Sequence, residues 1–295
     1  MATLYTEQSK NVTRTWFLMA IFLAIVVAIG YFVSYYYNNP AILYIAIIFS
    51  MVMNITSYWF SDKIALASTG AKEASESEYL ELHRILENLS ITAGLPKPRL
   101  YIIDDMAPNA FATGRNKEHS AVAVTKGLLQ TLDRNELEGV IAHELAHIGN
   151  RDILLSTVVV VLVGFIAMLA DMFLRMTLFG GRDNDNKGGG ALMILGIVFV
   201  VLSPIIATII QLAISRKREF LADASGALLT RYPEGLANAL QKISSYGAPM
   251  QKASNATAHM FISNPFGGKV MKGMAKLFST HPPVEERIQA LIGKK

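Results

Sequence analysis

Four apolar stretches, each long enough to cross a bilayer, constrain the fold of this chain more than any other feature. A helix rises ~1.5 Å per residue, so about 20 apolar residues cross a hydrocarbon core of ~30 Å. Charged residues make up only 17% of the 295-residue chain, which is low for a soluble protein. We therefore expect a multi-pass membrane protein with four transmembrane helices. The stretches run approximately from Trp16 to Tyr37, Ala41 to Phe60, Ile153 to Leu174 and Ala191 to Ile214.

The first two stretches have alternative interpretations. The first is too long for a secretory signal peptide, and its tyrosine-rich end at Tyr35–Tyr37 has no small-residue cleavage site. The second contains Asn54, Thr56 and Ser57, so a buried helix in a soluble core is its alternative. Length and the absence of charge favour a membrane span for both.

Basic residues gather on one side of the four stretches. They are Lys10 and Arg14 before the first, Lys63 and Lys72 after the second, Arg151 before the third, and Arg216, Lys217 and Arg218 after the fourth. The positive-inside rule then places both chain ends in the cytoplasm. We expect a transmembrane hairpin (1–60), a cytoplasmic catalytic segment (61–152), a second hairpin (153–214) and a C-terminal cytoplasmic segment (215–295).

The segment before the third stretch contains the run His143-Glu144-Leu145-Ala146-His147. On a helix this spacing puts two imidazoles one turn apart on the same face. Two neutral imidazoles in that arrangement bind one zinc ion, and the glutamate between them can act as general base toward a water. Asp133 and Glu136 predict an N-cap and a capping box for this helix, and Gly149 predicts its end.

A catalytic zinc ion commonly has three protein ligands. A metzincin would need glycine at 150 and histidine at 153, where this chain has Asn150 and Ile153. The remaining common choice for the third ligand is a glutamate on a separate helix. His147 precedes the third stretch by six residues and Glu219 follows the fourth by five, so both lie roughly 8–10 Å from the membrane face. We predict that Glu219 is the third ligand. The alternative is that Glu219 forms an ion pair with a basic neighbour on a solvated helix. Asp223, one turn later, is predicted to accept the free ring N–H of a ligand histidine.

The remaining pattern predicts a mainly helical protein with a small β-sheet. Predicted helices cover residues 75–93, 233–245 and 284–292, and predicted strands cover 99–103, 109–113 and 121–125. Residues 247–280, rich in glycine, serine, asparagine and methionine, are interpreted as a mobile loop region. His83, His119 and His259 are not expected to be metal ligands.

Four motifs carry a resemblance to a known family. They are Pro108 to Gly114, His143 to His147, Ser215 to Asp223, and Thr280 to Pro283 with Arg287. With the four spans, they make nearly the whole chain similar to the HtpX membrane zinc metalloproteases, which are grouped with the CAAX prenyl endopeptidases. The resemblance implies a zincin-like (gluzincin) catalytic domain with one zinc per chain, bound by His143, His147 and Glu219, and Glu144 as the catalytic acid/base.

The same resemblance implies a location and a role. Members lie in the bacterial plasma membrane with the active site in the cytoplasm. They cleave membrane proteins, and misfolded ones, as part of quality control under stress. Expected partners are therefore protein or peptide substrates and the lipid bilayer. No aromatic-interleaved basic patch suggests nucleic acid. The sequence leaves the oligomeric state open.

Two further site assignments have equally good structural alternatives. His281, with Arg287 behind it, is a candidate to stabilise the oxyanion of the reaction, or else a turn residue. Asn109, Ala110, Phe111 and Ala112 are candidates to bind the substrate backbone as an added strand, or else an ordinary strand.

Three other functions compete with a general membrane protease. One is a CAAX-type processing peptidase acting on lipidated C termini. Another is a site-2-type intramembrane protease, which would place the paired histidines inside a span. The third is a non-catalytic membrane scaffold or chaperone with a zinc site, against which the presence of Glu144 counts, because metal binding alone requires no base.

Overall fold

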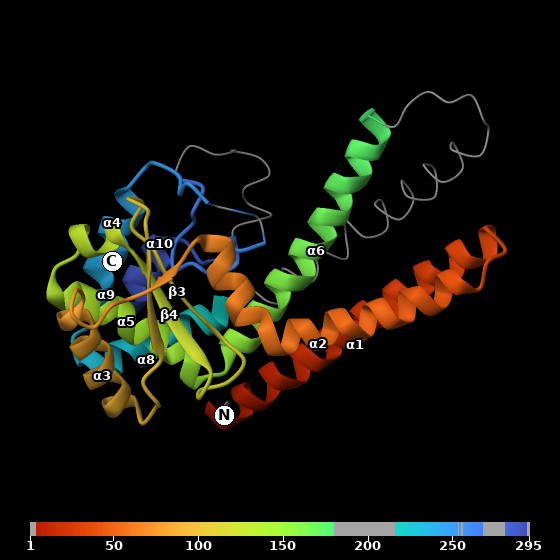
Figure 1. Ribbon diagram of the computed structural model, residues 1–295. Helices are drawn as coiled ribbons and strands as arrows, with labels where there is room; N and C mark the ends of the chain where they lie inside the picture. The colour runs from red at the N-terminus through yellow and green to blue at the C-terminus, as the bar shows by residue number, and fades with distance from the viewer. Residues whose placement is uncertain (1–3, 180–215, 253, 255, 268–280, 294–295) are drawn as a thin grey trace.

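The computed structural model describes residues 4–179, 216–252, 254, 256–267 and 281–293. A compact unit of helices around a small sheet carries two long projections. One is the antiparallel pair α1 and α2, and the other is α6 (Figure 1). The molecule is mainly helical, as the sequence predicts.

The first projection consists of α1 (Leu4–Tyr36) and α2 (Ala41–Thr69). Within them, Ser9–Tyr35 and Ala41–Thr69 are long and apolar enough to cross a membrane. Most of the surface of this pair is exposed apolar side chain, which suits contact with lipid. The first two predicted spans are thus confirmed as helices of the required length and composition.

The third predicted span falls within α6 (Asp152–Phe179). The lower part of α6 packs on α1 through a cluster of buried apolar side chains that includes Leu18, Phe22, Leu155, Val159 and Leu162. The fourth predicted span, residues 191–214, and the polar loop 184–190 lie outside the described residues.

The helix that contains the paired histidines is α5 (Arg134–Gly149). Its predicted start is confirmed, since Asp133 and Glu136 form a capping box. After Gly149 the chain turns sharply at Arg151, whose φ is 59°, and α6 leaves at 85° to α5. This bend brings Asp152, the first residue of α6, back toward the last turn of α5.

The sheet has four strands in the order β1 (Lys72–Glu73), β2 (Arg99–Ile103), β4 (Ser120–Thr125) and β3 (Ala110–Gly114). Strands β2 and β4 are parallel, and the other two pairs are antiparallel. Strand β3 is therefore an edge strand. The three predicted strands are confirmed to within one residue at each end.

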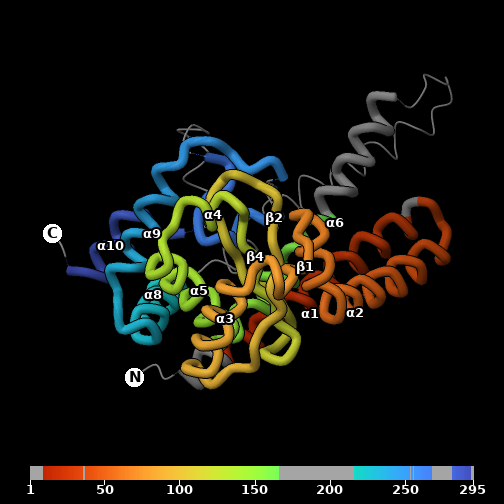
Figure 2. The backbone as a smooth tube through the Cα atoms, turned by 60° about the vertical axis from the view of Figure 1, so that its left-hand side comes forward, coloured from red at the N-terminus to blue at the C-terminus, as the bar shows by residue number. Residues whose placement is uncertain are grey.

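Alternate strand residues face two different cores, as the period of a strand requires. One face, with Leu100, Ala112 and Val122, packs on α3 (Leu80–Ala93), α5 and α9 (Pro233–Ser245). The other face, with Phe111 and Ala123, packs on the end of α2, on α6 and on the segment around Phe261. Figure 2 shows the sheet between these two groups of helices.

The other described helices are α4 (Lys126–Thr131), α8 (Arg216–Thr230), the short 3-10 helix η1 (Ala258–Met260) and α10 (Val284–Ile292). The predictions of 233–245 and 284–292 are confirmed. Helix α3 begins at residue 80 rather than 75.

One prediction is wrong in part. Residues 247–280 were expected to form a mobile loop, but residues 256–262 are packed against the sheet. Phe261 is fully buried, with its ring 5.2 Å from that of Phe111. Ile262 N–H donates to the carbonyl of Ala110 at 2.9 Å. Three consecutive apolar residues, Met260 to Ile262, explain the error, since their burial outweighs the polar composition around them. Residues 268–280 lie outside the described residues.

Candidate metal centre

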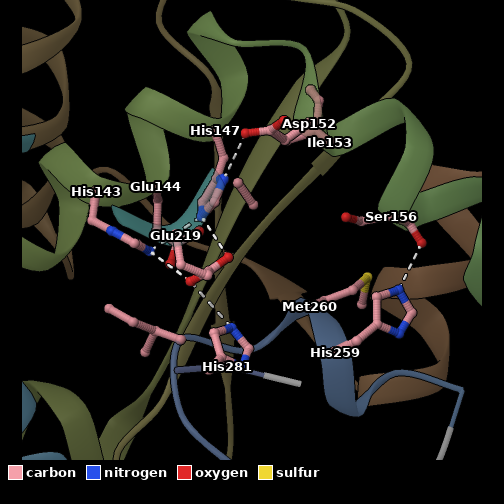
Figure 3. A pocket seen from close by; sticks show the side chains of 12 residues that line it. His143, Glu144, His147, Asp152, Ile153, Ser156, Glu219, His259, Met260 and His281 are labelled. Carbon is pink, nitrogen blue, oxygen red and sulfur yellow. Dashed lines mark hydrogen bonds and ion pairs between the residues drawn. The ribbon is translucent and has the colours of Figure 1, made fainter. Parts of the chain in front are cut away.

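Helix α5 turns His143 and His147 toward a common point, where their Nε2 atoms lie 3.1 Å apart. Helix α8 brings Glu219 to the same point (Figure 3). Its Oε1 lies 3.6 Å from Nε2 of His147, and its Oε2 lies 3.8 Å from Nε2 of His143. Donor atoms of all three residues fall within 4.8 Å of one another. The structure thus brings together the three residues that were predicted to bind zinc.

The close approach of α8 to α5 depends on Gly226. A Cβ at this position would lie 3.0 Å from the backbone nitrogen of His143, nearer than side chains normally come. The missing side chain lets α8 cross directly over the helix that holds the histidines. Glu219 and Asp223, earlier on α8, reach the site for this reason.

A carboxylate faces the other ring nitrogen of each histidine. Nδ1 of His143 lies 2.9 Å from Oδ1 of Asp223, and Nδ1 of His147 lies 3.1 Å from Oδ2 of Asp152. A ring nitrogen beside a carboxylate carries the proton, so both Nε2 atoms present lone pairs to each other. Two lone pairs at this distance are stabilised by a cation: Nη2 of Arg287 lies 3.5 Å from Nε2 of His143, and a metal ion or a proton on one ring would add to its effect.

The donor set fits a tetrahedral metal ion. Ligands bound at ~2.1 Å to a tetrahedral zinc ion stand about 3.4 Å from one another. The three separations, from 3.1 to 3.8 Å, bracket that value. In addition, Oε2 of Glu219 is buried and has no hydrogen-bond partner within the described part of the chain. Two imidazoles and a carboxylate are a common catalytic zinc set.

The charges of the cluster are set by burial and by its own members. Burial raises the pKa of Glu219, but His281, His147 and Arg287 outweigh it and hold that pKa well below the ordinary range. Burial likewise opposes charge on His147, yet the hydrogen bond to Asp152 and the nearby carboxylate of Glu219 raise its pKa to about 9. Glu219 is therefore ionised at neutral pH, and without a metal ion His147 holds a proton.

Arg287 on α10 holds Asp223 in place. Its Nε and Nη2 donate to the two oxygens of Asp223 at 2.8 and 2.7 Å, and its Nη1 donates to the carbonyl of Ile262 at 3.1 Å. Its side chain is only 1% exposed, and its nearest nitrogen to Glu219 is 3.9 Å away. A paired, planar guanidinium fixes the carboxylate that in turn orients His143. Arg287 was predicted to stand behind His281, and its principal contact is instead Asp223.

The role of Asp152 was missed by sequence reasoning. Besides His147, it accepts a hydrogen bond from the buried side-chain amide of Asn11 at 2.5 Å. Asn11 lies near the start of α1, so the first membrane helix is tied to a carboxylate that orients a metal ligand. The available signal was the position of an aspartate just after the predicted end of the helix at Gly149, but only the 85° bend makes the contact.

Glu144 lies beside the metal cluster and borders a cavity of about 30 Å³. The residue is 1% exposed, and burial raises its pKa, although His143 and His147 act in the opposite direction. A cavity of this size holds a water molecule. A buried carboxylate with a raised pKa beside a water is suited to accepting a proton near neutral pH.

Two further histidines border the same cavity. Nε2 of His281 lies 3.4 Å from Oε2 of Glu219, and burial is the main reason that its pKa is lowered to about 4. His281 is therefore neutral at pH 7 and able to donate a hydrogen bond without carrying charge. His259, which was not expected to be a ligand, points its Nε2 at the carbonyl of Ser156 at 3.0 Å, away from the three donors.

The four residues that were predicted to bind the substrate backbone have different surroundings. Phe111 points into the core and Asn109 bonds the backbone of Ser263 through its side chain. The carbonyl of Ala110, on the outer edge of β3, already accepts from Ile262. Ala112, the next residue with its backbone directed outward, borders the cavity. Of the four predicted residues, Ala112 alone is positioned beside the metal cluster.

Comparison with known proteins bears on this arrangement. The profile of peptidase family M48 matches residues 76–295. A protein described as "Protease HtpX homolog" from Thermoanaerobacter pseudethanolicus is 50% identical over 98% of this chain and 97% of its own length. One with the same description from Pyrococcus furiosus is 49% identical over 94% of each. The crystal structure of S. mikatae Ste24p matches with a TM-score of 0.50 and 18% identity, covering 98% of this chain and 66% of that one, which supports a shared fold alone.

Proposed function

Because the chain belongs to peptidase family M48 and is a membrane metalloprotease by that relationship, we propose that it is a zinc-dependent endopeptidase of the cytoplasmic membrane face. Its substrates on this proposal are membrane proteins, including misfolded ones, in the bacterial plasma membrane. The observation that carries the proposal is the convergence of His143, His147 and Glu219, with a separate buried carboxylate behind each histidine.

Zinc is the metal that these donors favour. Two imidazole nitrogens and one carboxylate oxygen, at separations that suit four-fold coordination, are typical of catalytic zinc sites with one position left for water or substrate. When bound, the ion supplies Lewis-acid polarisation of the scissile carbonyl and lowers the pKa of water.

The other catalytic roles are assigned to residues around the site. Glu144, which borders the cavity, is proposed to take a proton from the attacking water and to deliver it to the leaving amine nitrogen. Its burial keeps the carboxylate basic enough to do so near neutral pH. The neutral imidazole of His281 faces the same cavity and is proposed to donate to the developing oxyanion. Arg287 is proposed to act through Asp223 and His143 rather than on the substrate.

The substrate backbone is proposed to pair with the outer edge of β3 at Ala112. That edge is extended and borders the cavity. Its outward groups at Ala110 and Gly114 already bond Ile262 and Thr157, so within the described residues the backbone of Ala112 is the part left for a substrate. A cavity of about 30 Å³ has no room for a peptide, so binding requires the segments of His259 to Ile262 or of His281 to move outward.

Cleavage of a protein substrate by the purified full-length chain tests this proposal. A chelator is expected to stop cleavage of casein or of a membrane substrate, and added zinc to restore it. A peptide with a prenylated cysteine three residues from its C terminus is assayed beside them, and mass spectrometry separates the alternatives. Internal cuts in the protein substrates support an endopeptidase, and removal of only the three residues after the prenylated cysteine supports a CAAX-type peptidase. A chain that binds zinc but cleaves none of these substrates would instead support a scaffold.

A further inference from the structure

A second pocket, of about 470 Å³, lies away from the metal centre. It is formed by the C-terminal part of α2, the chain entering β2 and the turn between β3 and β4. Its charged and aromatic lining includes Trp59, Asp62 and Lys63 from α2, Lys97 just before β2, Arg99 at the start of β2, and Arg115, Glu118 and His119 from the turn. Leaving His119 aside, four of these residues are basic and two are acidic.

This pocket lies where α2 leaves the membrane. From Ala41, a hydrocarbon core of ~30 Å accounts for about 20 residues and ends near Phe60. Asp62 and Lys63 are the first charged residues of α2. Trp59 is 51% exposed, as expected for an aromatic side chain at the membrane–water boundary. The basic residues therefore stand at the depth of lipid headgroups.

The guanidinium of Arg115 lies over the ring of Trp59, with 4.5 Å between the guanidinium carbon and the ring centroid. Stacking on an aromatic face leaves the N–H edges of an arginine available. Among the described residues, neither Arg115 nor Lys63 has a carboxylate partner. Arg99 does have one, since it donates to Asp62 at 2.8 Å, and this pair forms the wall of the pocket.

An apolar stripe on α2 runs from this pocket toward the other end of the helix. Ile48, Val52, Ile55 and Trp59 follow one another at helical spacing, and each is more than half exposed. A molecule with an anionic head in the pocket and a hydrocarbon tail along the stripe would satisfy both surfaces. A free phosphate would satisfy only the first.

We propose that this pocket binds the phosphate of an anionic phospholipid, with Arg115 and Lys63 on the phosphate and the acyl chain along α2. The site has a consequence for the proposed catalytic edge. Arg115 directly follows β3, and Ala112 of that strand borders the metal centre. A bound headgroup ties the end of β3 to the bilayer surface.

Trp59 provides the test, because the chain has only one other tryptophan, Trp16. The full-length Trp16→Phe variant in an uncharged detergent is titrated with dioleoyl phosphatidylglycerol, dioleoyl phosphatidylcholine and sn-glycerol 3-phosphate, and Trp59 emission is followed. Phosphatidylglycerol is expected to change the emission saturably, and phosphatidylcholine to give no saturable change. Adding Arg115→Ala is expected to raise the half-saturation by about tenfold or more, as for loss of charge-assisted hydrogen bonds.

The half-saturation, rather than the starting emission, is compared because removing Arg115 alters the emission of Trp59 itself. Lys117→Ala is the matched control, since it removes one positive charge from the same turn outside the pocket. An equal loss in Lys117→Ala would show general surface attraction and overturn the proposal. Equal saturation by phosphatidylcholine would do the same. Saturation by glycerol phosphate with equal affinity would overturn the lipid assignment in favour of a soluble phosphate ester.

Discussion

Replacing Asp152 with Asn is expected to weaken zinc binding strongly at high pH and only slightly at neutral pH. The substitution keeps the shape of the side chain and a carbonyl oxygen for Nδ1–H of His147, 3.1 Å away in the wild type, but removes the charge. Asn11 can adjust by turning its amide, whose Oδ1 has no hydrogen-bond partner in the described structure. Turning that amide would release the carbonyl of Asn150, 3.2 Å from Nδ2 of Asn11, and Arg218, 3.7 Å from Oδ1 of Asp152, would lose a carboxylate neighbour. Neither change varies with pH between about 7 and about 9.5, so a comparison of the two pH values isolates the basicity of His147.

The magnitude follows from two opposing effects. Loss of a carboxylate behind a ligand histidine typically costs about 10- to 100-fold in metal affinity, and the conservative Asn places this change near tenfold. The same carboxylate, however, helps to raise the pKa of His147 to about 9, with burial as the largest opposing influence. A raised pKa means that the metal-free site holds a proton below about pH 9, which zinc must displace. At pH 7 this competition weakens wild-type affinity by about 100-fold, and the variant escapes about tenfold of it, which offsets its intrinsic loss.

Zinc affinity of the full-length protein, measured by chelator competition at about pH 7 and about pH 9.5, tests this reasoning. Wild-type affinity is expected to rise with pH through this interval and to level off above about pH 9. Asp152→Asn is expected to bind about tenfold less tightly at the higher pH and nearly equally at the lower. The exposed Asp104→Asn is the control. A loss of the same size at both pH values, or a larger loss at pH 7, would refute the assignment of Asp152 to His147.

Three further outcomes are expected. Glu144→Gln should retain about one zinc per chain while cleavage of casein falls by at least about 10²-fold, and a variant that cuts at the wild-type rate removes Glu144 as the base. Arg287→Met should lower the free energy of unfolding by about 3–5 kcal/mol, because it removes both charge-assisted bonds to the buried Asp223 and leaves His143 as its neighbour; thermal unfolding in detergent measures this, and an unchanged midpoint contradicts the pairing. Phe261→Ala should lower the free energy of unfolding by about 3–5 kcal/mol, because it removes the ring that packs on Phe111. A negligible change would contradict the packing of residues 256–262 against the sheet.

The sequence predicted those parts of the fold that depend on local rules. The start of α5 follows from Asp133 and Glu136, whose capping box needs only four residues. The strands follow from short apolar runs, and α9 and α10 from amphipathic spacing. The metal ligands could be predicted because two of them are one helical turn apart and because the expected four-span topology narrowed the choice of the third.

Long-range contacts could not be predicted in the same way. Asn11 and Asp152 are separated by 141 residues, and their contact depends on the bend between α5 and α6 and on the packing of α1 against α6. The segment around Phe261 was misjudged because its neighbours are polar, while its burial depends on Phe111 in a distant strand. Arg287 carried no local sign that its partner would be Asp223 rather than the substrate.

Zinc content of the full-length protein tests the central claim, that His143, His147 and Glu219 bind one metal ion together. The protein is loaded with zinc, freed of excess by gel filtration in detergent and analysed for metal, alongside Glu219→Ala and the exposed control Glu138→Ala. About one zinc per chain is expected for the wild type and the control, with a large loss in Glu219→Ala. Full occupancy at unchanged affinity in Glu219→Ala would contradict the account.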